Sequence, residues 1–183
     1  MAEKPLKHVT PDMVIRKRRA DLNIKAGYKD LLKRVIVVTV AVWILLSFVF
    51  LVCQANGMSN FPSIKDGDLL IAYRLQKDYE KDDAVIFEKD GKKMAGRVVA
   101  FESDTVTITE KGLLYINGTR QQGEILYPTY SKTKGDLQLT VPEGKCFILC
   151  DYRTKCQDSR DFGAVNMSDV KGKVITVLRR RGI

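Results

Sequence analysis

One apolar stretch dominates the pattern of hydrophobic and polar positions along this chain of 183 residues. Residues 35–52 read VIVVTVAVWILLSFVFLV, a run without any charged position. As a helix with a rise of ~1.5 Å per residue, the run is about 27 Å long, close to the ~30 Å hydrocarbon core of a bilayer. A buried pair of strands is a competing interpretation, but no turn residue interrupts the run, and a cleaved secretory signal has a shorter apolar core. We therefore predict one transmembrane helix over residues 35–53.

Short strand-like runs separated by turn residues replace this pattern in the rest of the chain. Asn117-Gly118 follows one of the runs and predicts a tight hairpin turn. The same positions begin an N-x-T sequence, a glycosylation acceptor, but we favour the turn. The pattern predicts a mainly β domain over residues 54–183, large enough to fold alone. The predicted strands cover residues 68–75, 84–88, 94–101, 105–109, 113–116, 146–150 and 174–178.

The distribution of charge predicts which side of the membrane each end of the predicted helix faces. Residues 1–34 hold ten Lys and Arg but four Asp and Glu, so +6 of the formal net charge of +9 precedes the apolar stretch. The positive-inside rule predicts that residues 1–34 are a basic cytoplasmic segment and that residues 54–183 are the extracellular domain of a single-pass plasma-membrane protein. The basic residues suit lipid headgroups, and we predict no nucleic-acid partner. Thr10 and Pro11 predict the start of a short helix, interrupted at Gly27.

Few side chains suited to metal or cofactor chemistry occur in this sequence. Its one His, at position 8, lies on the cytoplasmic side of the predicted helix, which argues against a Ser-His-Asp triad. None of its four Cys residues forms a C-x-x-C pair of the kind that binds zinc, so we predict no metal and no cofactor. Cys150 and Cys156 flank a short loop, where a disulfide and two free buried thiols are both open alternatives.

Three segments of the β domain carry extended motifs. Residues 57–68 read GMSNFPSIKDGD, residues 96–100 read GRVVA, and residues 149–163 read LCDYRTKCQDSRDFG. In this order they resemble three boxes of the type I signal peptidases: G-x-S-M-x-P-[ST]-[LIM]-x-x-G-D, K-R-[VI]-[IV]-[GA] and G-D-N-x-x-x-S-x-D-S-R-x-[FYW]-G. The resemblance implies a signal-peptidase-like β-fold. Within the family, the chain is most similar to the signal-peptidase-like proteins that accompany pilus assembly in Gram-positive bacteria.

The resemblance puts Ser59 at the position of the family's nucleophile and Gly96 at the position of its general-base lysine. A serine hydroxyl is a poor nucleophile until a base takes its proton, and a lysine serves as that base only when burial lowers its pKa. Glycine has no side chain for this role. Lys92 is about 13 Å away along the strand, Lys93 points to the other face, and Arg97 is effectively never deprotonated.

Other positions in the boxes imply support of the site rather than chemistry. Cys156 stands where the family has a serine that hydrogen-bonds the lysine, Asn60 replaces a Met, and Tyr152 replaces an Asn. The Asp-Ser-Arg run that begins at Asp158 is expected to form buried polar bonds. The supporting residues that the resemblance implies are Pro62, Gly67, Asp68, Arg97, Asp151, Cys156, Asp158, Ser159 and Arg160.

Two hypotheses follow for the activity. In the first, the chain has the signal peptidase fold with little or no hydrolytic activity and serves as a binding accessory in pilus assembly. In the second, it is an active type I signal peptidase, a serine endopeptidase that cleaves signal peptides from exported proteins with a base that the resemblance does not reveal. The missing lysine favours the first. The implied partners are membrane lipid, extended segments of secreted or pilin precursors, and the sortase and pilus machinery.

Overall fold

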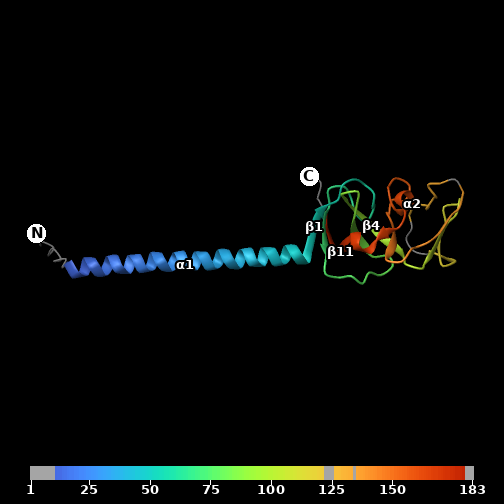
Figure 1. Cartoon of the computed structure of the whole chain (residues 1–183). Coiled ribbons are helices and arrows are strands. Elements are labelled where there is room, and N and C mark those ends of the chain that lie inside the picture. The colour runs from blue at the N-terminus through green and yellow to red at the C-terminus, as the bar shows by residue number, and fades with distance from the viewer. Residues whose placement is uncertain (1–10, 122–125, 134, 180–183) are drawn as a thin grey trace, which may run out of the picture. The chain divides into compact units, whose positions relative to one another are not determined.

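The computed structural model describes residues 11–121, 126–133 and 135–179, and the chain divides into two compact units between Leu46 and Ser47 (Figure 1). The first unit is helical, and the second is built mainly from antiparallel strands. The predicted fold class, a mainly β domain with one apolar N-terminal helix, is confirmed.

Helix α1 runs from Pro11 to Val49. Proline suits the first turn of a helix because its missing N–H would have no helical partner there. Thr10, the expected cap, lies outside the described residues. The part from Gly27 to Val49 is 23 residues long, has a mean hydropathy of 2.2, and has none of its apolar window buried. By length and composition it is able to cross a membrane.

Two predicted boundaries of the helical region are wrong. Gly27 does not interrupt the helix, because a glycine inside a helix costs only about 1 kcal/mol relative to alanine. The helix also ends at Val49 instead of residue 53. Strand β1 (Phe50–Gln54) begins there and pairs antiparallel with β2 (Leu69–Tyr73). An apolar, β-branched run fits a helix and a buried strand equally well. Pairing with β2 therefore determines that residues 50–54 form a strand.

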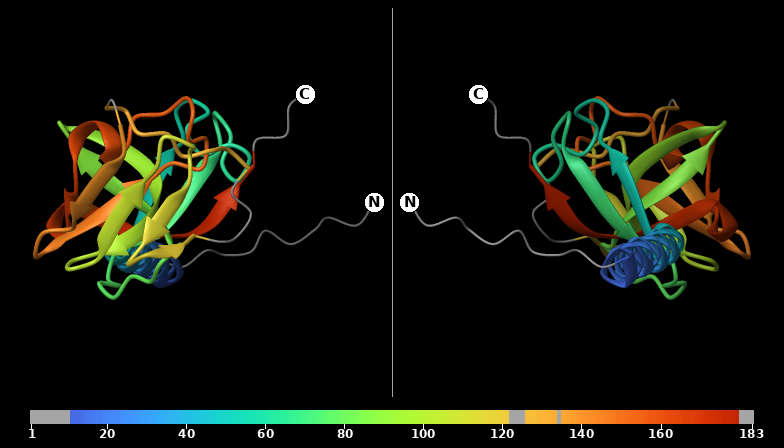
Figure 2. Two further views of the ribbon diagram at one scale, coloured as in Figure 1. Left: turned by 90° about the vertical axis from the view of Figure 1, so that its right-hand side faces the viewer. Right: turned by 90° about the vertical axis from the view of Figure 1, so that its left-hand side faces the viewer.

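The strands of the second unit form two antiparallel sheets (Figure 2). Beyond β2 the elements are β3 (Ala84–Lys89), β4 (Lys92–Phe101), β5 (Thr105–Ile108), β6 (Leu114–Ile116), β7 (Thr119–Arg120), β8 (Leu137–Thr140), β9 (Lys145–Leu149), helix α2 (Ser159–Phe162), β10 (Val165–Asn166), 3-10 helix η1 (Met167–Asp169) and β11 (Val170–Leu178). The larger sheet has the order β1-β2-β11-β3-β4-β9-β10, and the smaller has the order β7-β6-β5-β8.

Every predicted strand is present, although the ends differ by a few residues. The turn predicted at Asn117-Gly118 joins β6 to β7, and the two residues have the positive φ angles, 52° and 77°, that a two-residue type I′ hairpin requires. Strands β1, β7, β8 and β10 were not predicted. Two of them, β7 and β10, have only two residues each, too few for an alternating pattern.

Strand β4 separates two parts of the core, and this separation positions the site. On one face, Phe87 and Ile148 belong to a buried cluster between β3, β4 and β9. On the other face, Ile86 belongs to a second cluster, against which Ala95 packs. Because side chains alternate along a strand, Gly96 belongs to the first face.

Candidate active site

Ser59, the predicted nucleophile, lies on the loop between β1 and β2, and backbone hydrogen bonds close this loop at its base. The Ala55 N–H donates to the Asp68 carbonyl at 2.8 Å, and the Gly67 N–H donates to the Ala55 carbonyl at 2.9 Å. Gly67 has a φ of 83°, a left-handed conformation that favours glycine. The buried Asp68 carboxylate accepts from the Lys65 N–H at 2.9 Å. Gly67 and Asp68 therefore shape the loop that carries Ser59.

The position of Ser59 is held through its backbone. The residue is half-buried, and its carbonyl accepts a hydrogen bond from the Tyr152 N–H at 3.0 Å. Farther along the loop, the peptide bond between Phe61 and Pro62 is cis. Among the residues that the structure describes, no side chain hydrogen-bonds the Ser59 hydroxyl.

A cavity of about 90 Å³ opens beside Ser59, between the end of β1 and one edge of β4. Strand β3 pairs with β4 from Lys92 to Arg97, but β9 covers the opposite edge of β4 only from Arg97 onward. Below Arg97, that edge is not paired with any described strand. The lining combines side chains from β1, the loop and β4, among them Cys53, Ser59, Asn60, Lys93 and Ala95.

Asn60 connects this open edge of β4 to the loop after β9. Its Nδ2 donates to the Ala95 carbonyl at 2.8 Å, and its Oδ1 accepts from the Asp151 N–H at 3.3 Å. The residue is only 7% exposed, so its carboxamide is a fixed polar wall of the cavity. The Met of the family box could make neither hydrogen bond. The sequence indicated the replacement, but not this bridge.

The space beside Gly96, where the resemblance puts the missing base, is filled by the core. A Cβ on Gly96 would lie 2.5 Å from Ile148 Cγ2, 3.3 Å from Phe87 Cε1 and 3.2 Å from the Leu149 carbonyl oxygen. Real Cβ atoms essentially never approach another heavy atom closer than 3.0 Å. Ile148 is fully buried, so its branched side chain has little room to move aside. The first carbon of a lysine side chain would therefore meet an occupied position.

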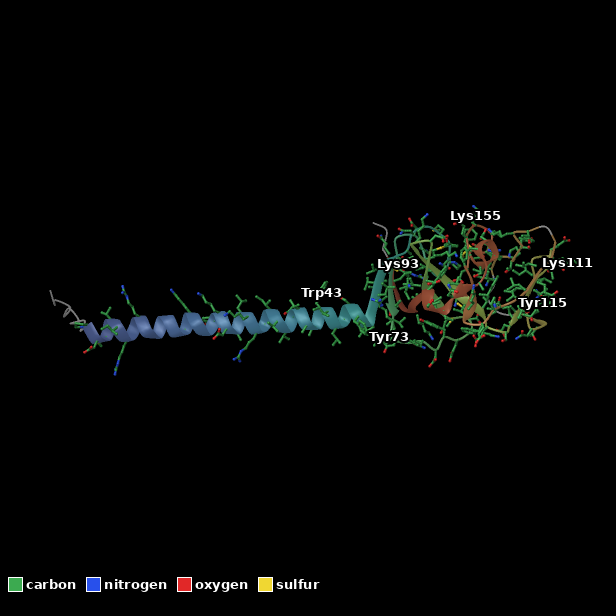
Figure 3. All side chains as sticks on the ribbon, in the orientation of Figure 1. Trp43, Tyr73, Lys93, Lys111, Tyr115 and Lys155 are labelled. Atoms are coloured by element: carbon green, nitrogen blue, oxygen red, sulfur yellow. A yellow bond between two sulfur atoms is a disulfide. The ribbon has the colours of Figure 1, made fainter. Side chains whose placement is uncertain are left out.

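Lys93, labelled in Figure 3, lines the same cavity as Ser59. The prediction that Lys93 points to the other face than Gly96 is correct. However, the cavity lies on that other face, so the orientation of Lys93 brings it to the cavity instead of excluding it from the site. Its side chain is exposed and does not hydrogen-bond Ser59 within the described part of the chain. Strand alternation predicted the face of Lys93, but not which face the Ser59 loop covers.

Arg97 and Asp151 join β4 to the loop after β9. Arg97 Nε donates to Asp151 Oδ1 at 3.0 Å, and Nη2 donates to Oδ2 at 3.1 Å. Arg97 Nη1 donates to the Asp82 carbonyl. The hydrogen bond to Asp151 is the main cause that raises the pKa of Arg97 above its ordinary value. Arg97 therefore stays protonated and acts as a connector.

Asp158 and Arg160 form a buried ion pair, with each side chain 1% exposed. Arg160 Nε donates to Asp158 Oδ1 at 2.9 Å, and Nη2 donates to Oδ2 at 2.8 Å. Asp158 also caps α2 by accepting from the Arg160 backbone N–H at 3.0 Å. The Ser159 hydroxyl accepts from the Ile148 N–H at 3.0 Å. These contacts hold β9 and the loop that follows it, and none of those described goes to Ser59.

A disulfide joins Cys150 to Cys156, whose Cα atoms are 6.4 Å apart. Of the two alternatives for these cysteines, a disulfide or two free buried thiols, the structure has the disulfide. The loop that it closes carries Asp151, the partner of Arg97, and Tyr152, whose N–H donates to Ser59. The two sulfur atoms also lie with an Asp158 oxygen within 4.8 Å of one another. Because metals bind thiolates and these sulfurs are bonded to each other, the cluster does not suit a metal ion.

A match to a family of known proteins covers most of the chain. The family model described as signal peptidase, peptidase S26, matches residues 28–178. The chain belongs to this signal peptidase family. The match confirms the resemblance seen in the three boxes and includes the apolar part of α1 and nearly all of the second unit.

Related proteins of this family carry the name signal peptidase I. The one from Bacillus caldolyticus is 31% identical over 143 residues, which cover 69% of this chain and 78% of the relative. Signal peptidase IB of Staphylococcus aureus strain N315 is 28% identical over 170 residues, covering 80% and 88%. A solved signal peptidase I from Enterococcus faecalis V583 is 31% identical with a TM-score of 0.45, and it covers 54% of this chain and 97% of its own.

Proposed function

We propose that this member of the signal peptidase family binds extended segments of secreted precursor proteins and hydrolyses them slowly or not at all. The observation that carries the proposal is the contact between the Gly96 position and Ile148. A lysine base cannot be restored there without moving a buried side chain 2.5 Å from the added Cβ. Ser59 is present at the nucleophile position but has no described base at its hydroxyl.

The chemistry explains why the rate should be low. General-base catalysis contributes about 10²–10⁴ to a rate, so a serine without a positioned base loses a factor of this size. Arg97 cannot supply the base, because Asp151 holds it in the protonated form. The remaining features of the site, a held loop and an open strand edge, support binding without turnover.

The open edge of β4 supports an extended client. An extended peptide binds a sheet edge by adding a strand, with its backbone supplying the hydrogen bonds. Below Arg97 the cavity-side edge of β4 is available over Lys93 and Ala95, apart from the Ala95 carbonyl that Asn60 occupies. The segment would lie directly beside Ser59, in the cavity that the two residues share.

We further propose that the second unit rests against lipid through the outer face of β1, β2 and β11. Gln54, Leu69 and Leu178 lie side by side across these strands. On the same face, Val52 is 55% exposed, and Leu69 and Leu178 are 37% and 49% exposed. Apolar side chains gathered on one sheet face suit a bilayer surface better than water. The positive-inside rule supports a cytoplasmic N-terminus and an extracellular β domain.

In cells, such a binder would act as an accessory that presents or shields precursors. The resemblance to the signal-peptidase-like proteins of pilus assembly supports pilin precursors as clients and the sortase machinery as a neighbour. This proposal depends on the first one, because an accessory of this kind requires binding without rapid cleavage.

An active signal peptidase is the second candidate, and one observation favours it. Lys93 lines the cavity beside Ser59, and its long side chain is not tied to another charge in the described part of the chain. A bound precursor that covered Lys93 would exclude water from the space that it shares with Ser59, the setting in which a lysine serves as a general base. The relatives named signal peptidase I also support this candidate.

Cleavage assays separate the two candidates. The full chain in lipid nanodiscs is mixed with a signal-peptide-bearing precursor, alongside the variants Ser59→Ala and Lys93→Met. We expect no cleavage above the Ser59→Ala background in the wild type. Wild-type cleavage that disappears in both Ser59→Ala and Lys93→Met would establish the second candidate instead.

A further inference from the structure

The lining of the cavity beside Ser59 carries positive charge and no negative charge. Lys93 is the one charged residue in its lining, and the polar residues there are Gln54, Asn56, Ser59 and Asn60. The described carboxylates near the site are engaged elsewhere: Asp66 accepts from the Gly57 N–H at 2.6 Å, and Asp151 pairs with Arg97. A ligand that enters the cavity therefore meets a cation and hydrogen-bond donors, but no carboxylate of its lining.

Lys93 is available for a partner from outside the chain. The residue opposite it on β3 is Glu88, whose carboxylate pairs with Lys171 at 3.8 Å. Glu88 is absent from the cavity lining, whereas Lys93 is part of it. Burial raises the pKa of the Cys53 thiol, and the positive charge of Lys93 opposes that rise. Lys93 and Cys53 therefore lie close enough in the cavity lining for their charges to interact.

Asn60 adds a held amide donor to the same lining. Its Nδ2 has two hydrogens, of which the Ala95 carbonyl accepts one at 2.8 Å. The Oδ1 contact with the Asp151 N–H prevents the amide from turning over, so the second hydrogen keeps its direction. A volume of about 90 Å³ has room for a short side chain of a few heavy atoms.

We propose that this cavity selects a client residue with a short carboxylate side chain, recognised by Lys93 and by the amide of Asn60. The inference rests on the proposed peptide-binding function and adds the chemical class of the side chain that is bound. A carboxylate is an acceptor without donors, so it matches both an ammonium and an amide N–H. A client with a lysine at the same position would place two positive charges together and bind less well.

A binding experiment with paired peptides tests this selection. Fluorescent ten-residue peptides of Ala and Ser carry Asp, Asn or Lys at one central position, and they are titrated onto the full chain in nanodiscs of zwitterionic lipid at low salt. The Ser59→Ala background prevents any cleavage. Asp and Asn have nearly the same shape, so their comparison isolates the charge. Lys93→Gln removes the proposed cation, and Lys92→Gln, at the exposed neighbouring position outside the cavity lining, is the matched control.

We expect the Asp peptide to bind about 2–5-fold more tightly than the Asn peptide, the effect of a partly exposed ion pair. The preference should disappear in Lys93→Gln and persist in Lys92→Gln. Equal binding of the Asp and Asn peptides overturns the inference, while peptide binding itself survives. A preference that both lysine variants lose equally also overturns it, because general surface charge would then be the cause. If none of the peptides binds, the proposed function fails together with the inference.

Discussion

The Cγ2 methyl of Ile148 lies 2.5 Å from the point where a Cβ on Gly96 would be, so the two residues share one place in the core. In most strands, replacing glycine by alanine stabilises the protein, because glycine loses more conformational freedom on folding. At Gly96 the same replacement should destabilise the protein instead. This relationship gives the first prediction.

Gly96→Ala should lower the free energy of unfolding by about 1–3 kcal/mol, the usual cost of overpacking a well-filled core. Ile148→Ala should cost about 2–5 kcal/mol through its cavity. The double variant should cost less than the sum of the two by at least about 0.5 kcal/mol, because the new methyl enters the new cavity. Denaturant unfolding of the full chain in detergent measures all three. Strict additivity would contradict the packing described here.

Removing the disulfide should destabilise the second unit by about 2 kcal/mol, as expected for the cross-link of a short loop. The test compares the unfolding midpoint of the wild type with that of the double variant Cys150→Ala and Cys156→Ala. Wild type measured in a reducing agent is the control, and it should approach the double variant. If reduction leaves the midpoint unchanged, the cysteines are not joined in the folded protein.

Asp158→Asn should lower the free energy of unfolding much more than Asp151→Asn. The Asp158–Arg160 pair is 1% exposed on both sides, so loss of the carboxylate leaves a buried, unpaired guanidinium and costs about 3–5 kcal/mol. The Arg97–Asp151 pair is 29% and 17% exposed, and solvent compensates for part of its loss, which should cost about 1 kcal/mol. Asn remains a good helix cap, so the difference reports the ion pair rather than the cap of α2. Equal losses would show that burial does not set the cost.

The thiol of Cys146 should make stability fall in alkaline solution. Burial raises its pKa from 9.0 to about 12. The unfolded chain therefore releases this proton first, and the stabilisation from the protonated folded form is complete below pH 9 and lost progressively up to about pH 12. Within that window the free energy of unfolding should decrease by roughly 1 kcal/mol per pH unit from this group.

Other groups titrate over the same pH range, so the test compares the pH dependence of two proteins that differ only at Cys146. Wild type and Cys146→Ala are unfolded in parallel at pH 8, 9 and 10, and the slope of the wild type with pH should be the steeper one. Parallel slopes would mean that Cys146 is reached by solvent in the folded protein.

Much of the fold was predictable from the sequence, because the long strands carry their own local signals. Residues 84–88 are a short β-rich run, and Asn117-Gly118 fits one class of turn. The end of α1 was not predictable in this way. Phe50 and the residues after it are as apolar as the helix before them, and only pairing with β2 distinguishes strand from helix.

The candidate site was likewise predictable only in part. The positions of Ser59 and Gly96 in their boxes were visible in the sequence, and so was the replacement of the family's lysine by Gly96. The contribution of Lys93 was not, because alternation assigns a side chain to a face but does not say which face a distant loop covers. The filling of the Gly96 position by Ile148 depends on β9, which is about 50 residues away in the chain.

The disulfide between Cys150 and Cys156 bears on when the site is completed. If the β domain lies outside the membrane, as proposed, its cysteines meet oxidising conditions only after the chain has been exported. Until then, the loop that presents the Tyr152 N–H to Ser59 is held by weaker contacts alone. A newly made copy would thus acquire its finished peptide-binding site only on the side of the membrane where its clients emerge.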